Sequence, residues 1–140
     1  MRLIGFNFRK VSAERLSDSN KEIKLNTNID ISEIEEVKSD LLKGPETVLG
    51  IKFKYSLNYD PNIAKIELNG NILLALEKKL AEEIILKWKT KKMTEDFKLS
   101  LFNLILRKCN VRALQLEDEM NLPFHITMPS LKKPEKEKKE

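Results

Sequence analysis

The chain has 140 residues, of which 41% are hydrophobic and 34% are charged, and 26 basic residues against 22 acidic ones give a net charge of +4. This length suits one domain with one core, and the longest aliphatic run, residues 72–76, is far too short to cross a membrane. A single cysteine and a single histidine exclude an internal disulfide and the usual zinc clusters, so we expect no metal and no cofactor.

The two ends of the chain differ in character from its middle. Polar residues interrupt residues 1–10 too early for a secretory signal, so we expect a cytoplasmic protein. Residues 131–140 hold five basic and three acidic residues and little that could be buried, which predicts a disordered charged tail. We therefore expect one domain over residues 1–130. Because the tail carries half of the net charge, the domain is nearly neutral, and its composition does not indicate nucleic-acid binding.

The first half of the chain alternates apolar and polar residues with the period of half-buried strands. Turn-forming residues at 17–20 and 43–45 interrupt this pattern. Four strands in a row, without helices between them, predict an antiparallel sheet. The predicted strands cover residues 4–8, 23–31, 51–59 and 64–76.

Two positions determine where the predicted third and fourth strands begin and end. Pro61 follows Asp60, which predicts a tight type I turn between these strands. Asn69 and Gly70 could form a further hairpin turn, but the alternation stays in phase across them. Unbroken phase favours one long strand, with a bulge or a close approach at Gly70.

After residue 76 the apolar spacing becomes helical. Leu80, Ile84 and Trp88 predict a buried stripe on a short helix over residues 77–89, and Thr94 is expected to cap a second helix. The apolar residues of this second helix cover an arc of roughly 220°, about twice what a surface helix needs. They are Phe97, Leu99, Leu101, Phe102, Leu104, Ile105, Leu106 and Cys109.

So wide an apolar arc must be covered on two sides, and the sheet covers one. We therefore expect an oligomer, a dimer or a tetramer, in which a second copy packs on the long helix. The expected interface residues are Phe97, Leu101, Leu104 and Ile105. The predicted fold class is α+β, with a four-stranded antiparallel sheet followed by a short and a long helix packed on one face.

This order of elements resembles the SecB family of protein-export chaperones. Residues 64–72, Ala-Lys-Ile-Glu-Leu-Asn-Gly-Asn-Ile, resemble the fourth strand of that family, and residues 104–109 with 121–126 resemble its long helix and the extended segment after it. The resemblance implies a tetramer, a dimer of dimers with long helices between two sheets. It also implies that the protein holds non-native polypeptides in grooves lined with apolar and aromatic side chains.

Some members of that family pass their clients to the translocation motor SecA, which docks on an acidic surface. Glu67 on the fourth strand stands at a matching place, whereas Arg9 and Lys10 on the first strand bring the opposite charge. We therefore do not expect a SecA-type motor among the partners. The expected partners are unfolded client polypeptides and further copies of the chain.

A protein that holds unfolded chains needs accessible apolar surface with free backbone groups beside it, because its clients share no side-chain sequence. Pro123 and Pro129 keep the segment between them extended. Candidates for polypeptide binding in this segment are Leu122, Phe124, Ile126 and Met128. Candidates for an opposite wall are Tyr55, Tyr59 and Phe102, together with Phe53. All of these residues could instead belong to an ordinary core.

Three other features have plainer readings. Cys109 lies on the apolar arc, where a free thiol behaves as a small hydrophobic residue, and the lone His125 is expected to be a hydrogen-bonded structural residue. The acidic run at 117–119 opposes the helix dipole. We expect the helix to end before this run, or Arg107 or Arg112 to pair with it, in preference to metal binding.

We predict a cytoplasmic holdase that binds unfolded or exported polypeptides by hydrophobic capture, without ATP. The alternative is a nucleic-acid-binding or regulatory interaction module with a basic surface, and a partner-specific adaptor comes third. That basic surface would consist of Arg2, Arg9, Lys10, Arg15 and the lysine-rich residues 87–92. The four glycines stand apart and form no phosphate loop, and we do not expect an enzyme.

Overall fold

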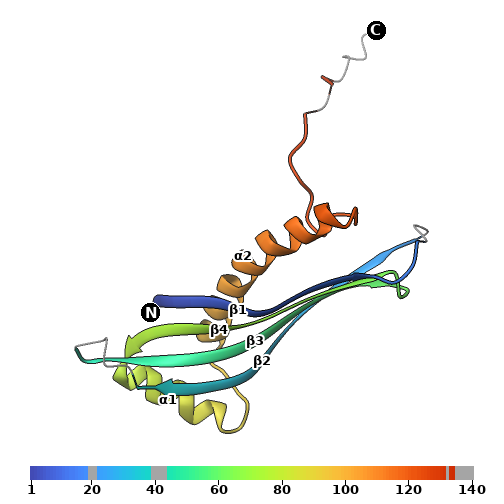
Figure 1. Cartoon of the computed structure of the whole chain (residues 1–140). Helices are drawn as coiled ribbons and strands as arrows, with labels where there is room; N and C mark the ends of the chain where they lie inside the picture. The colour runs from blue at the N-terminus through green and yellow to red at the C-terminus, as the bar shows by residue number, and fades with distance from the viewer. Residues whose placement is uncertain (19–21, 39–43, 132, 135–140) are drawn as a thin grey trace.

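The computed structural model describes residues 1–18, 22–38, 44–131 and 133–134. The tail predicted over residues 131–140 and the breaks predicted at 17–20 and 43–45 lie partly outside the described residues. The fold is α+β, as predicted: four antiparallel strands precede a short and a long helix (Figure 1). The elements are β1 (Arg2–Arg15), β2 (Lys24–Val37), β3 (Glu46–Asp60), β4 (Ala64–Glu77), α1 (Lys78–Trp88) and α2 (Glu95–Glu119).

The sheet has the strand order β1-β4-β3-β2, and each neighbouring pair is antiparallel. β3 and β4 form a central hairpin, while β1 and β2 lie at opposite edges (Figure 1). Within the described parts of the chain, the outward backbone groups of β2 and of residues 2–14 of β1 make no backbone hydrogen bond. Both edges are therefore open to a further strand.

One face of the sheet is buried under the two helices, and the other face is largely polar, apart from an apolar patch that includes the buried Val48 and Ala75. Alternate residues of β3 and β4 point into the core, from Leu49 to Tyr59 and from Ala64 to Leu76. Ala81 and Ile84 of α1 and the stripe of α2 that begins at Phe97 complete the same core. The outer residues of β3, such as Lys52 and Lys54, stay exposed, which confirms the alternation seen in the sequence.

The edge strands are longer than predicted because bulges interrupt their alternation: β1 has two, at Ile4 and Arg9, and β2 has one, at Ser32. In β1 the inward residues change from even to odd numbers at Arg9, which has no partner position on β4. In β2 they change from odd to even numbers at Ser32, so Ile34 is buried. A bulge flips the phase of every later side chain. The single-phase patterns at 4–8 and 23–31 therefore ended where the bulges begin.

β4 runs through Asn69 and Gly70 without a turn, as predicted. A Cβ atom at Gly70 would lie 2.5 Å from the carbonyl oxygen of Asn7 and 2.8 Å from the ring of Phe53. The predicted close approach is thus present, and the bulge sits opposite, in β1. Only glycine leaves room for the neighbouring backbone and ring at this position.

The turn between β3 and β4 is tight, as predicted, but the type I assignment is wrong. The Asp60–Pro61 peptide bond is cis, and Asn62 has a φ of 55°. The backbone N–H of Ile63 donates to the carbonyl oxygen of Tyr59 at 2.8 Å, a span of four residues. A type I turn instead bonds residues three apart.

Both helices lie where they were predicted, but the residues that they bury differ in part from the predicted ones. Thr94 Oγ1 accepts the backbone N–H of Phe97 at 3.3 Å and so caps α2, as expected. On α1 the predicted stripe holds for Ile84, which is buried, and for Trp88, which is half-buried against the core, whereas Leu80 is 39% exposed and Ala81 is buried in its place. Within the described residues, no helix is both long enough and apolar enough to span a membrane.

α2 continues through the acidic run and ends at Glu119. The expectation that it would stop earlier is wrong, because Glu117 points into the core and finds partners there. Arg112 donates to Gln115 at 3.1 Å and does not pair with this acid. Only part of the predicted 220° arc is buried within one chain: Leu101 is fully buried, whereas Leu99 is 65% exposed.

Candidate functional site

A buried polar cluster joins the end of α2, strand β3 and the segment after the helix. Glu117 is fully buried. Its carboxylate accepts hydrogen bonds from the Tyr59 hydroxyl and from the backbone N–H of His125, the latter at 3.0 Å, and it lies 2.8 Å from the ring nitrogen Nδ1 of His125. Because a carboxylate only accepts, Nδ1 must carry a proton. Three hydrogen-bonding groups thus converge on one buried carboxylate, so its oxygens have the partners that a buried polar group needs.

A second set of contacts surrounds this centre. The other ring nitrogen of His125 lies 3.0 Å from Asn110 Oδ1, and the Tyr55 hydroxyl donates to the same oxygen at 3.3 Å. Burial, and after it the nearby Glu117 carboxylate, raises the pKa of Tyr59, and burial likewise raises the pKa of Tyr55. Both hydroxyls therefore remain neutral donors at physiological pH. The expectation of a hydrogen-bonded structural His125 is confirmed.

The cluster pins the segment that follows α2. The carbonyl oxygen of Pro123 lies 2.6 Å from the Tyr59 hydroxyl, and Leu122 is only 5% exposed. Phe124, Ile126 and Met128 remain 42%, 37% and 46% exposed. The segment is thus anchored at one end and presents apolar side chains to solvent.

The predicted polypeptide-binding residues therefore fall into two groups. Tyr55, Tyr59 and Leu122 are buried and hold the structure together. Phe124, Ile126, Met128 and the half-buried Phe102 are accessible. Phe53 belongs to the core, where its ring packs 5.2 Å from that of Phe6.

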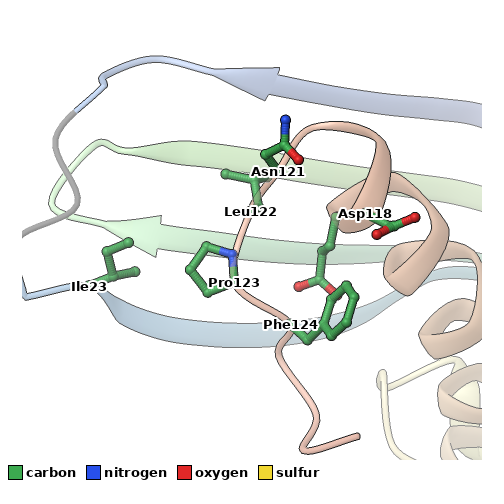
Figure 2. Close-up of a pocket in the computed structure, with 7 residues that line it drawn as sticks. Ile23, Asp118, Asn121, Leu122, Pro123 and Phe124 are labelled. Carbon is green, nitrogen blue, oxygen red and sulfur yellow. The ribbon is translucent and has the colours of Figure 1, made fainter.

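A pocket of about 440 Å³ opens beside the pinned segment. Figure 2 shows Pro123 turned toward Ile23, which directly precedes β2, and Phe124 beside the last turn of α2. The lining residues are Ile23, Glu117, Asp118, Asn121, Leu122, Pro123 and Phe124. We call this hollow the turn pocket.

A second pocket, of about 410 Å³, lies farther along β2. It is enclosed by β2, by the connection between the helices and by the first turns of α2. Its lining residues are Ile29, Asp30, Ile31, Trp88, Lys91, Met93, Lys98 and Phe102. We call it the β2 pocket. It contains one of the predicted wall residues, Phe102, but not Tyr55 or Tyr59.

The two pockets lie along the same open strand edge. Ile23 lines the turn pocket and Ile29 lines the β2 pocket, so six residues of extended chain, about 20 Å, separate them. The half-buried Leu25 lies between them on the same face of β2. An extended polypeptide added beside β2 could pair with its free backbone groups and place side chains in both pockets.

Sequence reasoning missed this edge because it sought the site on β3. Ile23, Leu25 and Ile29 were assigned to a strand, but their edge position follows from the strand order, which alternation does not reveal. Glu117 could have been found: continuing the four-residue spacing of the buried stripe from Leu101 through Cys109 leads to it.

Glu67, the residue matched to the acidic docking surface, lies on the outer face of the sheet. Its carboxylate contacts Lys54 at 2.9 Å and Lys10 at 3.1 Å. Hydrogen bonds from these two ammonium groups, Lys54 first, lower the pKa of Glu67. The carboxylate is ionised but surrounded by cations, so this face presents little free negative charge.

The residues named for the alternative, basic surface are largely engaged at the N-terminal end. Arg2 pairs with Glu46 at 2.8 Å, and Lys10 pairs with Glu67. Arg15 donates to the carbonyl oxygen of Asn121 at 3.3 Å. Because these basic groups already contact acidic or carbonyl oxygens of the same chain, less positive charge remains to bind a polyanion.

Of the predicted interface residues, Phe97, Leu101 and Ile105 are buried within one chain. Leu104 is half-buried. On the same face of α2, seven residues on, Val111 is 59% exposed. The part of α2 that could meet a second copy therefore centres on Leu104 and Val111.

No family model matches the sequence, and no curated protein matches it. Among solved structures, a SecB-like chaperone from Mycobacterium tuberculosis, Rv1957, matches over 95% of this chain and 91% of its own chain. The two are 13% identical, with a TM-score of 0.44, and the solved structure holds a ChAD peptide from the Rv1956 HigA1 antitoxin. The function proposed below rests on the geometry of this chain.

Proposed function

We propose that this protein is a SecB-like holdase chaperone that binds non-native polypeptides in extended form along the open edge of β2. The observation that carries the proposal is the combination of a free strand edge with two pockets spaced along it. Backbone pairing is independent of client sequence, and the pockets add hydrophobic affinity. The proposed site of action is the cytoplasm.

The exposed apolar residues after α2 extend this site. Phe124 lines the turn pocket, and Ile126 and Met128 follow it into solvent. When a client covers these side chains, the removal of their apolar surface from water stabilises the complex by about 25 cal/mol per Å². Many such small contacts give affinity for unfolded chains in general, and no nucleotide is needed.

Self-association is part of the proposal. Besides the Leu104 and Val111 face of α2, the open edge of β1 carries Leu3, Ile4 and Val11, each 40–42% exposed. An unpaired edge strand with exposed apolar side chains is normally covered in a stable protein. We expect a dimer or tetramer in solution, and its mass by light scattering would measure this. A monomer at all concentrations would contradict this part of the proposal.

Suppression of the aggregation of a chemically denatured model protein tests the function. The wild-type chain should suppress aggregation at an equal subunit ratio, and the double variant Phe124→Ser, Ile126→Ser should do so less well. The matched control is Leu80→Ser, Leu86→Ser, which removes two apolar residues from α1 that are 39% and 64% exposed. This control should act like wild type.

Two results would count against the proposal. Absence of suppression by a wild-type chain with native circular dichroism would reject the holdase function. Equal loss of activity in both double variants would show that general surface hydrophobicity, and not the segment after α2, binds the client.

A further inference from the structure

The β2 pocket is apolar at its base and cationic at its rim. Ile31 is 8% exposed and forms part of the core, and Met93 is half-buried. At the rim, Lys91 Nζ lies 4.6 Å from the centre of the Trp88 ring and Lys98 Nζ lies 5.5 Å from the centre of the Phe102 ring. Two ammonium groups thus stand over the two aromatic residues that line the pocket.

The backbone holds the first of these lysines in place. The end of α1 is closed by hydrogen bonds from Lys92 N–H to the Lys87 carbonyl and from Lys91 N–H to the Trp88 carbonyl, at 3.1 and 2.8 Å. This is a Schellman motif, whose left-handed residue is most often glycine. Here Lys91 occupies that position with a φ of 58°. The turn directs its side chain back over Trp88.

The charge of the rim is only partly compensated: two lysines line the pocket against one acid, Asp30, and Glu33 interacts with Lys91 at longer range. Among the described residues, neither Lys91 nor Lys98 has a carboxylate within 4.0 Å. One acid, the exposed Asp30, lines the pocket, and Glu33 farther along β2 is already paired with Lys52 at 2.9 Å.

We propose that the β2 pocket selects client segments in which an apolar residue is flanked by acidic residues, and that it disfavours basic flanks. This inference rests on the proposed function and names its substrate class. The apolar residue would enter between Ile29, Trp88 and Phe102, and the flanking carboxylates would meet the two ammonium groups. Two exposed ion pairs, each contributing a factor of about three, give a preference of about tenfold over neutral flanks.

Fluorescence anisotropy with three labelled, unstructured peptides tests this preference. The peptides share one apolar core and differ in their flanks, which are all Glu, all Gln or all Lys. Wild type should bind the Glu peptide about tenfold more tightly than the Gln peptide and bind the Lys peptide most weakly. The double variant Lys91→Glu, Lys98→Glu should reverse this order, and Lys91→Gln, Lys98→Gln should bring the three affinities together.

The control is Lys65→Glu, Lys79→Glu, which makes the same change in net charge at two exposed lysines outside the pocket. It should keep the wild-type order. Equal affinity of wild type for all three peptides, or an unchanged order in the charge-reversed variant, would overturn the preference while leaving the proposed function intact. Failure of all three peptides to bind would overturn the proposed function, and the preference with it.

Discussion

Replacing Glu117 with alanine should destabilise the protein by about 3–5 kcal/mol. The change removes the acceptor of the His125 backbone N–H and of its ring Nδ1. A buried donor without a partner costs about 1–3 kcal/mol, and the lost side chain leaves a space next to Tyr59. Tyr59 itself retains the Pro123 carbonyl oxygen at 2.6 Å. Breaking one side of a buried polar pair commonly has a cost of this size.

Replacing Glu117 with glutamine should cost less than about 1 kcal/mol. The amide oxygen can accept from Tyr59 and from the His125 backbone, while the amide NH₂ faces the ring. The imidazole can then carry its proton on Nε2, where Asn110 Oδ1 lies 3.0 Å away, and accept at Nδ1. Every member of the cluster keeps a partner, and a buried charge is no longer needed.

Urea denaturation at one fixed protein concentration measures both variants, because an oligomer's stability depends on concentration. Far-ultraviolet circular dichroism is the suitable signal, since the single tryptophan, Trp88, reports on the β2 pocket. An alanine variant as stable as wild type would refute a stabilising role for the cluster. A glutamine variant as unstable as the alanine variant would refute the proposed move of the imidazole proton of His125 from Nδ1 to Nε2.

Three further predictions concern other parts of the fold. Gly70→Ala should cost more than about 2 kcal/mol in urea denaturation, because its methyl group would lie 2.5 Å from the Asn7 carbonyl oxygen; an unchanged midpoint would contradict this packing. Burial raises the pKa of the Cys109 thiol to about 12, so a thiol reagent at neutral pH should react no faster than the chain unfolds, and a rapid burst would contradict its burial. Because the pKa of Glu67 is lowered in the folded state, its ion pairs stabilise the protein above the unfolded pKa of 4.5, and this stabilisation is lost as the pH falls through the folded pKa. Glu67→Gln should therefore be less stable than wild type near neutral pH and as stable as wild type in strong acid. A difference in unfolding free energy that stays constant with pH would contradict this.

The centre of the sheet could be predicted closely from the sequence, and its edges could not. β4 was expected over 64–76 and extends over Ala64–Glu77, since its alternation has no break. In β1 and β2 the bulges at Arg9 and Ser32 reverse the alternation. A bulge depends on pairing with the neighbouring strand, so it cannot be predicted from the residue pattern of one strand alone.

The candidate site was only partly predictable for a related reason. Period two correctly placed Tyr55 and Tyr59 on the inner face, but it carries no information about which polar atoms meet their hydroxyls. Those partners, Asn110 and Glu117, come from a helix about 55 residues later in the chain. Likewise, Phe102 was named as a wall residue, whereas the opposite wall is β2, whose edge position depends on the whole strand order.

Amide hydrogen exchange across β2, with and without an unfolded client, tests polypeptide binding most directly. In the free protein every second amide of Lys24–Val37 points away from β3 and should exchange rapidly. A client strand paired along this edge should slow exchange at those amides between residues 24 and 31, with smaller changes in the buried strand β4. Unchanged exchange along β2 when the client is bound would contradict binding at this edge.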